Sequence, residues 1–391
     1  MNTYSVIMLG PRGSGKTMFL ASMYKKLSTQ GKLKFFLKVE GAEKRKRLNT
    51  IYTQVAFDED WPVGTARGEL SEWEFTCCVQ TEDLSIYDAC KFVYIDYSGG
   101  RLTDPEGEGE EDEEFNNKIQ AADIILVLLD GQKLLAFIGQ IREGLKWANG
   151  DLPNMLQEVQ KIQDKPVHFV ISKWDIVAPD YSLEEVRDRL LDIEEFNNLV
   201  IARNKARTPI RLIPVSSVGQ GFATLLQNGS MAKNIDVLPT PFQVEVPLAC
   251  TLPDKINVEL KELAKKIEAE KNKEIKVDPK YSLGDIAGQF FGLMGGGVKN
   301  IQQLLPKKYQ FDEGVLEDFI KGAERGVREK NAEAQNRTEE LRDKQKEFLN
   351  NVSNEKTALD SAVASFQKIE NTLKIDFPES DLSNVLDDSE E

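Results

Sequence analysis

The sequence predicts an α/β fold: a doubly wound, mostly parallel sheet with one antiparallel edge hairpin, followed by an α-helical C-terminal module. Three observations support this prediction. Apolar runs typical of buried strands alternate with segments of helical spacing over residues 1–253. Short polar motifs follow several of these runs, at the strand ends where open α/β sheets bind ligands. From residue 254 onward the strand-like runs stop, and charged residues fill the gaps between helically spaced apolar ones.

Length and charge narrow the class of protein. The chain of 391 residues can hold two or so domains and a substantial core. Its net charge of −15 is concentrated in two acidic segments, Asp104 to Glu114 and Asp376 to Glu391. The remainder is nearly neutral, which argues against nucleic acid as a partner. The basic run 44–47 could contact phosphate, but its spacing favours the solvated face of a helix.

The sequence gives no signal for export or for a membrane span. The longest apolar stretch without a charge, Ile286–Val298, is too short and too rich in glycine for a simple span. The N-terminus lacks a charged-then-apolar signal pattern, and the four cysteines show no metal-ligand spacing. We therefore expect a cytoplasmic protein with reduced thiols.

The expected elements can be placed along the chain. The first part has a strand, a glycine-rich turn, a helix, a strand, a basic helix and an antiparallel hairpin. Their ranges are Tyr4–Leu9, Met18–Leu27, Leu33–Val39, a helix ending near Phe57, and the hairpin strands Glu69–Gln80 and Lys91–Asp96. The second part alternates helices with buried strands. Their ranges are Phe115–Ala122, Ile124–Leu129, Gln132–Gln163 with a break near Asn149–Pro153, Val167–Ile171, Leu183–Arg203 and Ile210–Pro214.

The turn after the first strand fits the phosphate-loop pattern G-x-x-x-x-G-K-[ST]. Its residues are Gly10-Pro11-Arg12-Gly13-Ser14-Gly15-Lys16-Thr17. The glycines would let backbone N–H groups wrap a polyphosphate, and the next helix would direct its positive dipole end at the anion. Lys16 would place a cation on the β- and γ-phosphates, and Thr17 would offer a hydroxyl to Mg²⁺. Phosphate binding is therefore favoured over an ordinary glycine turn.

Two further motifs would serve the terminal phosphate. Asp96-Tyr97-Ser98-Gly99 ends a strand, where Asp96 can hold a magnesium-bound water and the Gly99 amide can meet a γ-phosphate. Thr65 precedes the hairpin, and its hydroxyl could ligate Mg²⁺ only while a γ-phosphate is present. We expect Lys16, Thr65 and Gly99 to act in hydrolysis. The expected metal ligands are Thr17, Thr65 and Asp96.

A fourth motif, Ser172-Lys173-Trp174-Asp175, would select the base. The Asp175 carboxylate can accept two hydrogen bonds, from N1–H and the exocyclic amine of guanine, whereas adenine offers no such pair. The aliphatic stem of Lys173 can lie across the ring. Ser216 and Ser217 follow the last strand and could close the pocket with backbone N–H groups. The alternative interpretation is an ordinary loop with Trp174 as a core aromatic residue.

Together these motifs resemble those of the TRAFAC-type GTPases, over residues 4–217. They are GPRGSGKT at 10–17, Thr65, DYSG at 96–99, SKWD at 172–175 and SS at 216–217. The resemblance implies that Lys16 and Thr17 serve the phosphates and Mg²⁺. It also implies that Thr65 and Asp96 belong to nucleotide-dependent switches and that Asp175 recognises guanine. The implied activity is GTP hydrolysis by direct water attack, which would reset a switch that controls a protein effector.

A closer likeness is to the double-GTPase family of bacterial conflict systems. It depends on the long insert before Thr65, on WPVGT at 61–65 and on the missing glutamine after Gly99. Gly100 and Arg101 stand where many GTPases have that water-orienting residue, so hydrolysis should be slow or assisted by a partner. Arg12 could crowd an arginine that a partner inserts into the site, or it could take the place of that arginine.

The sequence leaves two other function classes open, a nucleotide-gated scaffold and an ATPase. Ser172 replaces the asparagine that usually begins the base motif, which would lower affinity. A catalytically weak, nucleotide-gated scaffold, whose helical module docks a protein or membrane partner, is the alternative to an enzyme. An ATPase would require Asp175 to be irrelevant.

The C-terminal third is expected to form a helical module over residues 254–376. Gly284, Gly288 and Gly292 recur within 283–305 and would permit close helix packing. A packed helical hairpin is favoured there over a membrane or partner contact.

A heptad stripe lies further along this third. Its members are Val352, Leu359, Phe366 and Leu373, with Ala362 and Ile369 at the alternate positions. The stripe could join two copies of the chain or pair with the glycine-rich helix. Residues 377–391 are expected to be an acidic, disordered tail. His168, the only histidine, is expected to lie in the core rather than to act in catalysis.

Overall fold

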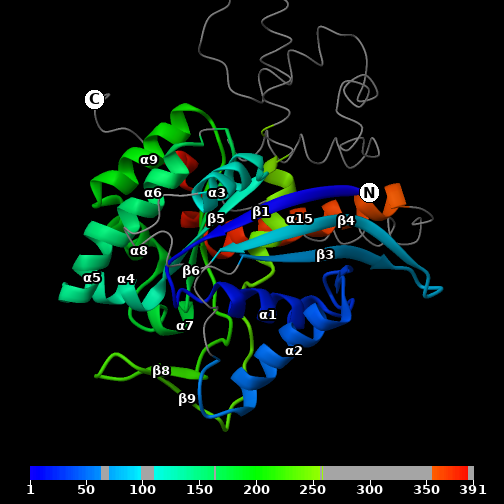
Figure 1. The fold of residues 1–391 in the computed structure, drawn as a ribbon, viewed down its shortest axis with the longest axis horizontal. Helices are drawn as coiled ribbons and strands as arrows, with labels where there is room; N and C mark the ends of the chain where they lie inside the picture. The colour runs from blue at the N-terminus through cyan, green and yellow to red at the C-terminus, as the bar shows by residue number, and fades with distance from the viewer. Residues whose placement is uncertain (63–69, 98–109, 163, 256–257, 259–354, 386–391) are drawn as a thin grey trace, which may run out of the picture.

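The fold is α/β, built on a mostly parallel sheet (Figure 1). The computed structural model describes residues 1–62, 70–97, 110–162, 164–255, 258 and 355–385. The sheet has seven strands in the order β2-β3-β4-β1-β5-β6-β7. The strands are β1 (Asn2–Leu9), β2 (Phe36–Val39), β3 (Leu70–Gln80), β4 (Ile86–Tyr97), β5 (Ile124–Asp130), β6 (Val167–Ser172) and β7 (Ile210–Pro214). A small separate hairpin is formed by β8 (Ala223–Leu225) and β9 (Met231–Lys233).

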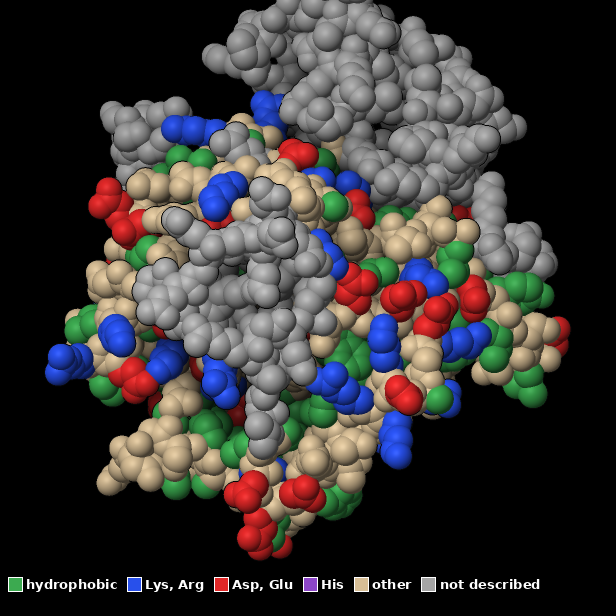
Figure 2. All heavy atoms as spheres, viewed as in Figure 1, with side chains coloured by type: hydrophobic (Ala, Val, Ile, Leu, Met, Phe, Trp, Pro, Cys, Tyr) green, Lys and Arg blue, Asp and Glu red, His purple; other side chains and the backbone are tan. Residues whose placement is uncertain are grey.

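Helices cover the sheet and connect its parallel strands. They are α1 (Lys16–Leu27), α2 (Ala42–Phe57), α3 (Glu110–Ala121), α4 (Gly131–Ile138), α5 (Arg142–Lys146), α6 (Leu152–Gln160), α7 (Trp174–Val177), α8 (Leu183–Leu191), α9 (Glu194–Lys205) and α15 (Glu355–Asp376). Among the described helices, none is both long and apolar enough to cross a membrane. On the face seen in Figure 2, basic and acidic side chains are interspersed.

The parallel strands follow from runs of apolar residues that are buried on both faces. Every residue of β5 is buried, because helices lie on each side of it. In β1, Tyr4, Val6 and Met8 join one core with α1 and α15, whereas Ile7 and Leu9 join a second core with the helices from α3 to α9. The alternation of side chains along the strand produces this division.

The expected hairpin is confirmed as the antiparallel pair β3 and β4. It is not the edge of the sheet, however, because β2 pairs antiparallel with β3 outside it. The strand β4 also begins at Ile86, five residues before the expected Lys91. The polar segment between the predicted strands therefore contributes to the ladder as well.

The predicted break in the helical region 132–163 lies in a different place. The chain leaves α4 at Gly139–Ile141 and returns as α5, whereas residues 147–151 form a π-helix that runs directly into α6. Gly144 makes the turn possible, because a Cβ there would collide with the backbone of Phe137. Pro153 does not break the chain, since it lies in the first turn of α6, where the hydrogen-bond spacing of the π-helix changes to that of an α-helix.

The described part of the heptad stripe packs on the sheet. Phe366 makes edge-to-face contacts with Phe35 and Phe92, at centroid distances of 5.0 and 6.0 Å. Leu359 and Leu373 are buried in the same core. This is a correction to the expected division at residue 254, because α15 completes the core of the α/β domain. Heptad spacing places apolar side chains on one face of a helix but does not select the surface that covers it.

The tail is likewise ordered where it is described. Residues 378–380 and 382–384 form short 3₁₀-helices, and Leu382 is fully buried. The Asn204 side chain donates hydrogen bonds to the carbonyl groups of Leu382 and Val385. The expected disorder is therefore wrong for residues 377–385. The glycine-rich segment 283–305 and Val352 lie outside the described residues.

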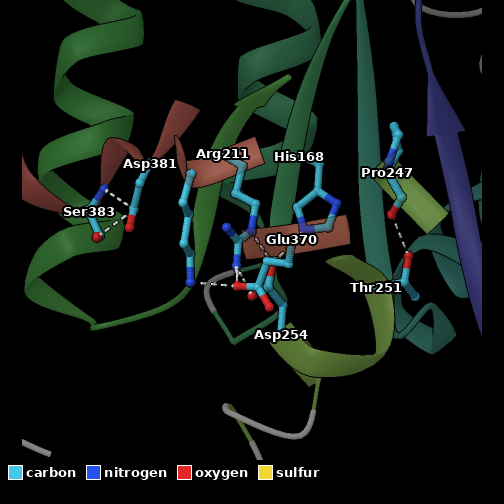
Figure 3. A network of polar contacts seen from close by, with 9 residues as sticks. His168, Arg211, Pro247, Thr251, Asp254, Glu370, Asp381 and Ser383 are labelled. Atoms are coloured by element: carbon cyan, nitrogen blue, oxygen red, sulfur yellow. Dashed lines mark hydrogen bonds and ion pairs between the residues drawn. The ribbon is translucent and has the colours of Figure 1, made fainter. Parts of the chain in front are cut away.

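A buried network of charges ties α15 to the strands (Figure 3). His168 of β6 is in the core, as expected, and its Nε2 lies 2.7 Å from Oδ2 of Asp254. Arg211 of β7 donates to both Asp254 oxygens, at 2.6 and 2.5 Å, and to Oε1 of Glu370 in α15, at 2.7 Å. Lys374 lies 2.8 Å from the same Glu370 oxygen. The network therefore joins the described segment that ends at residue 255 to α15, which begins at residue 355.

Candidate functional site

The candidate site lies at the carboxyl ends of the parallel strands. The strand order reverses at β1, which has β4 on one side and β5 on the other. Ligand sites of open α/β sheets form at such a reversal, because the connections on its two sides diverge and leave a crevice. The glycine loop 10–17 follows β1 directly and therefore lies at this position.

The backbone of the loop needs its glycines. Gly13 and Gly15 have φ values of 84° and 89°, in the left-handed region that strains other residues. Gly15 precedes the first residue of α1. At Gly10 a Cβ would lie only 2.7 Å from Oγ of Ser14, whose hydroxyl is buried. A tight turn that opens a helix of this length exposes unpaired N–H groups to an anion.

Lys16 is held inside the loop. Its Nζ donates to the carbonyl oxygen of Gly10 at 2.7 Å and to that of Pro11 at 3.4 Å. Burial lowers its pKa, while the charge of Asp96 acts in the opposite direction. Neutral carbonyl groups are weaker partners for an ammonium group than phosphate oxygens are. A bound anion could therefore replace these carbonyl groups as the partner of Lys16.

Thr17 and Asp96 meet beside Lys16. Oγ1 of Thr17 donates to Oδ2 of Asp96 at 3.0 Å. Burial raises the pKa of Asp96, and Lys16, Thr17 and Arg47 each act to lower it. The hydroxyl and carboxylate oxygens are hard ligands of the kind that Mg²⁺ prefers, so the residues present fit that ion.

The base motif begins at the end of β6. Ser172 donates to the carbonyl oxygen of Leu129 at 3.1 Å, and Lys173 adopts a left-handed conformation with φ of 54°. Asp175 follows in the first turn of α7. The motif therefore lies at the same edge of the sheet as the glycine loop, two strands away from β1.

The Asp175 carboxylate is buried, and among the described residues only one of its two oxygens has a hydrogen-bond partner. Its Oδ1 accepts a hydrogen bond from Oγ of Ser216 at 2.6 Å, whereas Oδ2 has no partner within the described part of the chain. Burial raises its pKa, and the bond from Ser216 acts against that rise. A buried carboxylate oxygen without a donor is costly and marks a place where a ligand could donate.

Ser216 and Ser217 link this motif to the rest of the site. Oγ of Ser216 accepts hydrogen bonds from the backbone N–H groups of Val218 and Gly219, which fixes the hydroxyl that donates to Asp175. The carbonyl oxygen of Ser217 accepts from the Ser22 hydroxyl of α1 at 2.9 Å. The base loop and the helix of the phosphate loop are therefore directly connected.

Sequence reasoning missed the turn after β5. Nζ of Lys173 lies 2.8 Å from the carboxylate of Asp130, which also caps α4 by accepting from the Gln132 backbone N–H. Gly131 packs so closely on the base motif that a Cβ would collide with the carbonyl oxygen of Ser172. An Asp-Gly pair at the end of a buried strand is the signal that could have identified this turn, since the other motifs also follow strands.

The hairpin β8–β9 was also missed. Nζ of Lys233 donates to the carbonyl oxygens of Gln54, Asp58 and Asp60, at 3.1, 2.8 and 2.7 Å. The indole N–H of Trp61 donates to the carbonyl oxygen of Met231 at 2.8 Å. These bonds fix the end of α2 and the first part of the WPVGT motif to a hairpin that follows the base loop.

The remaining predicted residues have different outcomes. Arg12 is exposed in the loop. Thr65 and Gly99 lie outside the described residues, as does the acidic segment up to residue 109. A groove of about 400 Å³ runs along exposed residues of α2, and no predicted site residue lines it.

Comparison with known proteins adds no assignment. A scan against models of protein families finds no match, and a search of curated proteins finds none either.

Proposed function

We propose that this chain binds guanine nucleotides with Mg²⁺, hydrolyses GTP slowly and acts as a nucleotide-dependent switch for a protein partner. The observation that carries the proposal is the buried Oδ2 of Asp175, which has no partner among the described residues and lies at the same strand edge as the glycine loop. A phosphate loop alone would suit many nucleotides. A buried carboxylate beside it selects among them.

The base is proposed from hydrogen-bond chemistry. Guanine presents two adjacent donors, N1–H and the exocyclic amine, to a carboxylate, whereas adenine presents an acceptor at N1. Ser216 fixes one oxygen of Asp175 and leaves the other for the ligand. The ion pair with Asp130 would hold Lys173 while its stem covers the ring.

The phosphates and the metal are proposed from the other end of the site. The N–H groups of the loop, the dipole of α1 and Lys16 would bind the phosphates. Thr17 would hold Mg²⁺ directly and Asp96 through a water molecule, with Thr65 added on the evidence of the sequence alone. The ion would neutralise charge on the β- and γ-phosphates.

Slow turnover is proposed because Gly100 and Arg101 follow Gly99 in the sequence and supply no water-orienting amide. The same observation favours the second candidate, a nucleotide-gated scaffold that hardly hydrolyses GTP. Single-turnover hydrolysis separates the two: loss of a measurable rate in Lys16→Ala supports the enzyme, and no rate in the unaltered chain supports the scaffold.

The base assignment is tested by Asp175→Asn. We expect GDP affinity, measured with a fluorescent analogue, to fall by about 100-fold, because two charge-assisted hydrogen bonds are lost. Xanthosine diphosphate should gain affinity, because xanthine has a carbonyl group where guanine has its amine and could accept from the new amide.

The matched control is Asp180→Asn, an exposed aspartate that follows α7. It should change neither affinity. Equal binding of ADP and GDP by the unaltered chain would contradict the guanine assignment.

A further inference from the structure

One cation near the phosphate side of the site, Arg47, belongs to the basic run 44–47, for which the sequence alone favoured a solvated helix face. Arg47 lies in the second turn of α2, and its guanidinium group is 5.5 Å from the centroid of the Trp73 ring. Trp73 is 2% exposed on β3 and pairs directly with Tyr94 of β4. Tyr94 and Asp96 share a face of β4, because side chains alternate along a strand. The stack therefore places Arg47 close to the carboxylate of Asp96, which accepts the hydrogen bond from Thr17.

The charge of Arg47 is available to a ligand. It is one of the charges that lower the pKa of the Asp96 carboxyl against the effect of burial. No carboxylate among the described residues forms an ion pair with it. Stacking on Trp73 occupies one face of the guanidinium and leaves its N–H groups, which lie in the plane, able to donate. An edge of this kind matches the oxygens of a phosphate group.

The helix that carries Arg47 is held in place. It packs on α1, which begins at Lys16 (Figure 1). The Tyr52 hydroxyl donates to the carbonyl oxygen of Pro239 at 3.0 Å, and Lys233 bonds to three carbonyl groups at the end of the helix and just beyond it. A cation on a fixed support needs little rearrangement when charge develops nearby.

We infer that Arg47, on α2 of this same chain, supplies a second cation, besides Lys16, to the terminal phosphate of the bound nucleotide. The inference rests on the proposed function and adds to it a residue that stabilises charge. In hydrolysis a water oxygen bonds to the γ-phosphorus, the bond to the bridging oxygen of GDP breaks, and both protons of the water leave with inorganic phosphate. Arg47 donates hydrogen bonds to the transferring group and takes no proton.

The test uses three variants of the full chain. Arg47→Met keeps an aliphatic cover over Trp73 but removes the charge, Arg47→Lys keeps the charge but not the planar fork, and Lys46→Met removes a neighbouring exposed charge as a matched control. Affinity is measured for GDP alone and for GDP with aluminium fluoride, which mimics the transferring phosphoryl group. Single-turnover hydrolysis and the unfolding temperature are measured in parallel.

For Arg47→Met we expect the preference for GDP with aluminium fluoride over GDP to fall about tenfold or more, as loss of a charge-assisted hydrogen bond requires. Hydrolysis should slow by at least the same factor, with GDP affinity within about twofold of the unaltered chain. Arg47→Lys should be intermediate, and Lys46→Met should be unchanged.

Two kinds of result would overturn the inference, and they have different consequences for the proposed function. If Arg47→Met keeps the full preference and rate, or loses GDP affinity and thermal stability in parallel with no change in preference, then Arg47 has only a structural role and the proposed nucleotide site stands. If the unaltered chain binds no guanine nucleotide, both the inference and the proposed function fail.

Discussion

Two groups of buried carboxylates lie at different ends of the parallel strands, and they differ in how they are paired. Near the beginnings of β6 and β7, Asp254 and Glu370 are surrounded by His168, Arg211 and Lys374. At the carboxyl edge of the sheet, Asp175 has one oxygen without a partner in the described structure. Asp96, at the same edge, accepts a bond from the Thr17 hydroxyl while burial still dominates its pKa.

The pKa shifts express this difference. The pKa values of Asp254 and Glu370 are lowered, because the charges of Arg211 and Lys374 outweigh the effect of burial. The pKa values of Asp96 and Asp175 are raised, because burial outweighs their partners. Paired carboxylates stabilise the fold, whereas the underpaired ones cost stability that a ligand could recover.

The largest effect is expected from Arg211→Met, which leaves Asp254 buried without its main cation and Glu370 with only Lys374. The free energy of unfolding should fall by about 3–5 kcal/mol, as measured by urea unfolding. The control is Lys161→Met, which breaks an exposed ion pair with Glu158 and should cost less than about 1 kcal/mol. Similar losses in the two variants would show that the network is not a structural centre.

An intermediate effect is expected from acid. The folded pKa values of Asp254 and Glu370 lie below their ordinary values of 3.8 and 4.5, so the unfolded chain binds protons more readily. Stability from this network is therefore complete above those ordinary values and is lost as the pH falls below them, by about 1 kcal/mol or more. Urea unfolding at pH 7 and pH 3.5 measures it. The acid-dependent loss should be smaller in Arg211→Met, and an equal loss would argue against the network as its source.

The smallest effect is expected at the other group and has the opposite sign. Asp96→Asn removes a buried charge whose pKa is raised, so the nucleotide-free chain should become more stable by about 1 kcal/mol. The unfolding temperature should rise by about 2–4 °C. Affinity for GTP with Mg²⁺ should fall at the same time. A drop in stability would mean that Asp96 is paired as well as Asp254 is.

Much of the fold was predictable because its signals are local. The strands β5, β6 and β7 coincide closely with apolar runs, and the glycine loop identifies the turn between β1 and α1. The break at Gly139–Ile141 was not predictable, because it depends on the approach of Gly144 to the Phe137 backbone, which no spacing reveals. The surface on which the apolar stripe of α15 packs was not predictable either, because it also depends on a contact that no spacing reveals.

The candidate site divides in a similar way. The residue types of its loops could be predicted, since phosphate, Mg²⁺ and base recognition each require particular groups after a strand. The pairing of Lys173 with Asp130 and the stacking of Arg47 on Trp73 could not, because they join residues 43 and 26 positions apart in the chain. Such contacts depend on strand order and helix placement.

By itself, the sequence determined the alternation of strands and helices, the backbone freedom of the glycine loop and the chemical groups at the strand ends. Hydrophobic periodicity and glycine conformation are properties of short segments, so they need no knowledge of the whole fold. Only the tertiary structure decided that α15 closes the core, that Arg211 neutralises Asp254, and that an oxygen of Asp175 is left buried with no partner in the described part of the chain. Burial and pairing depend on which distant segments meet, and in this chain they distinguish the carboxylates that hold the fold from those that could hold a ligand.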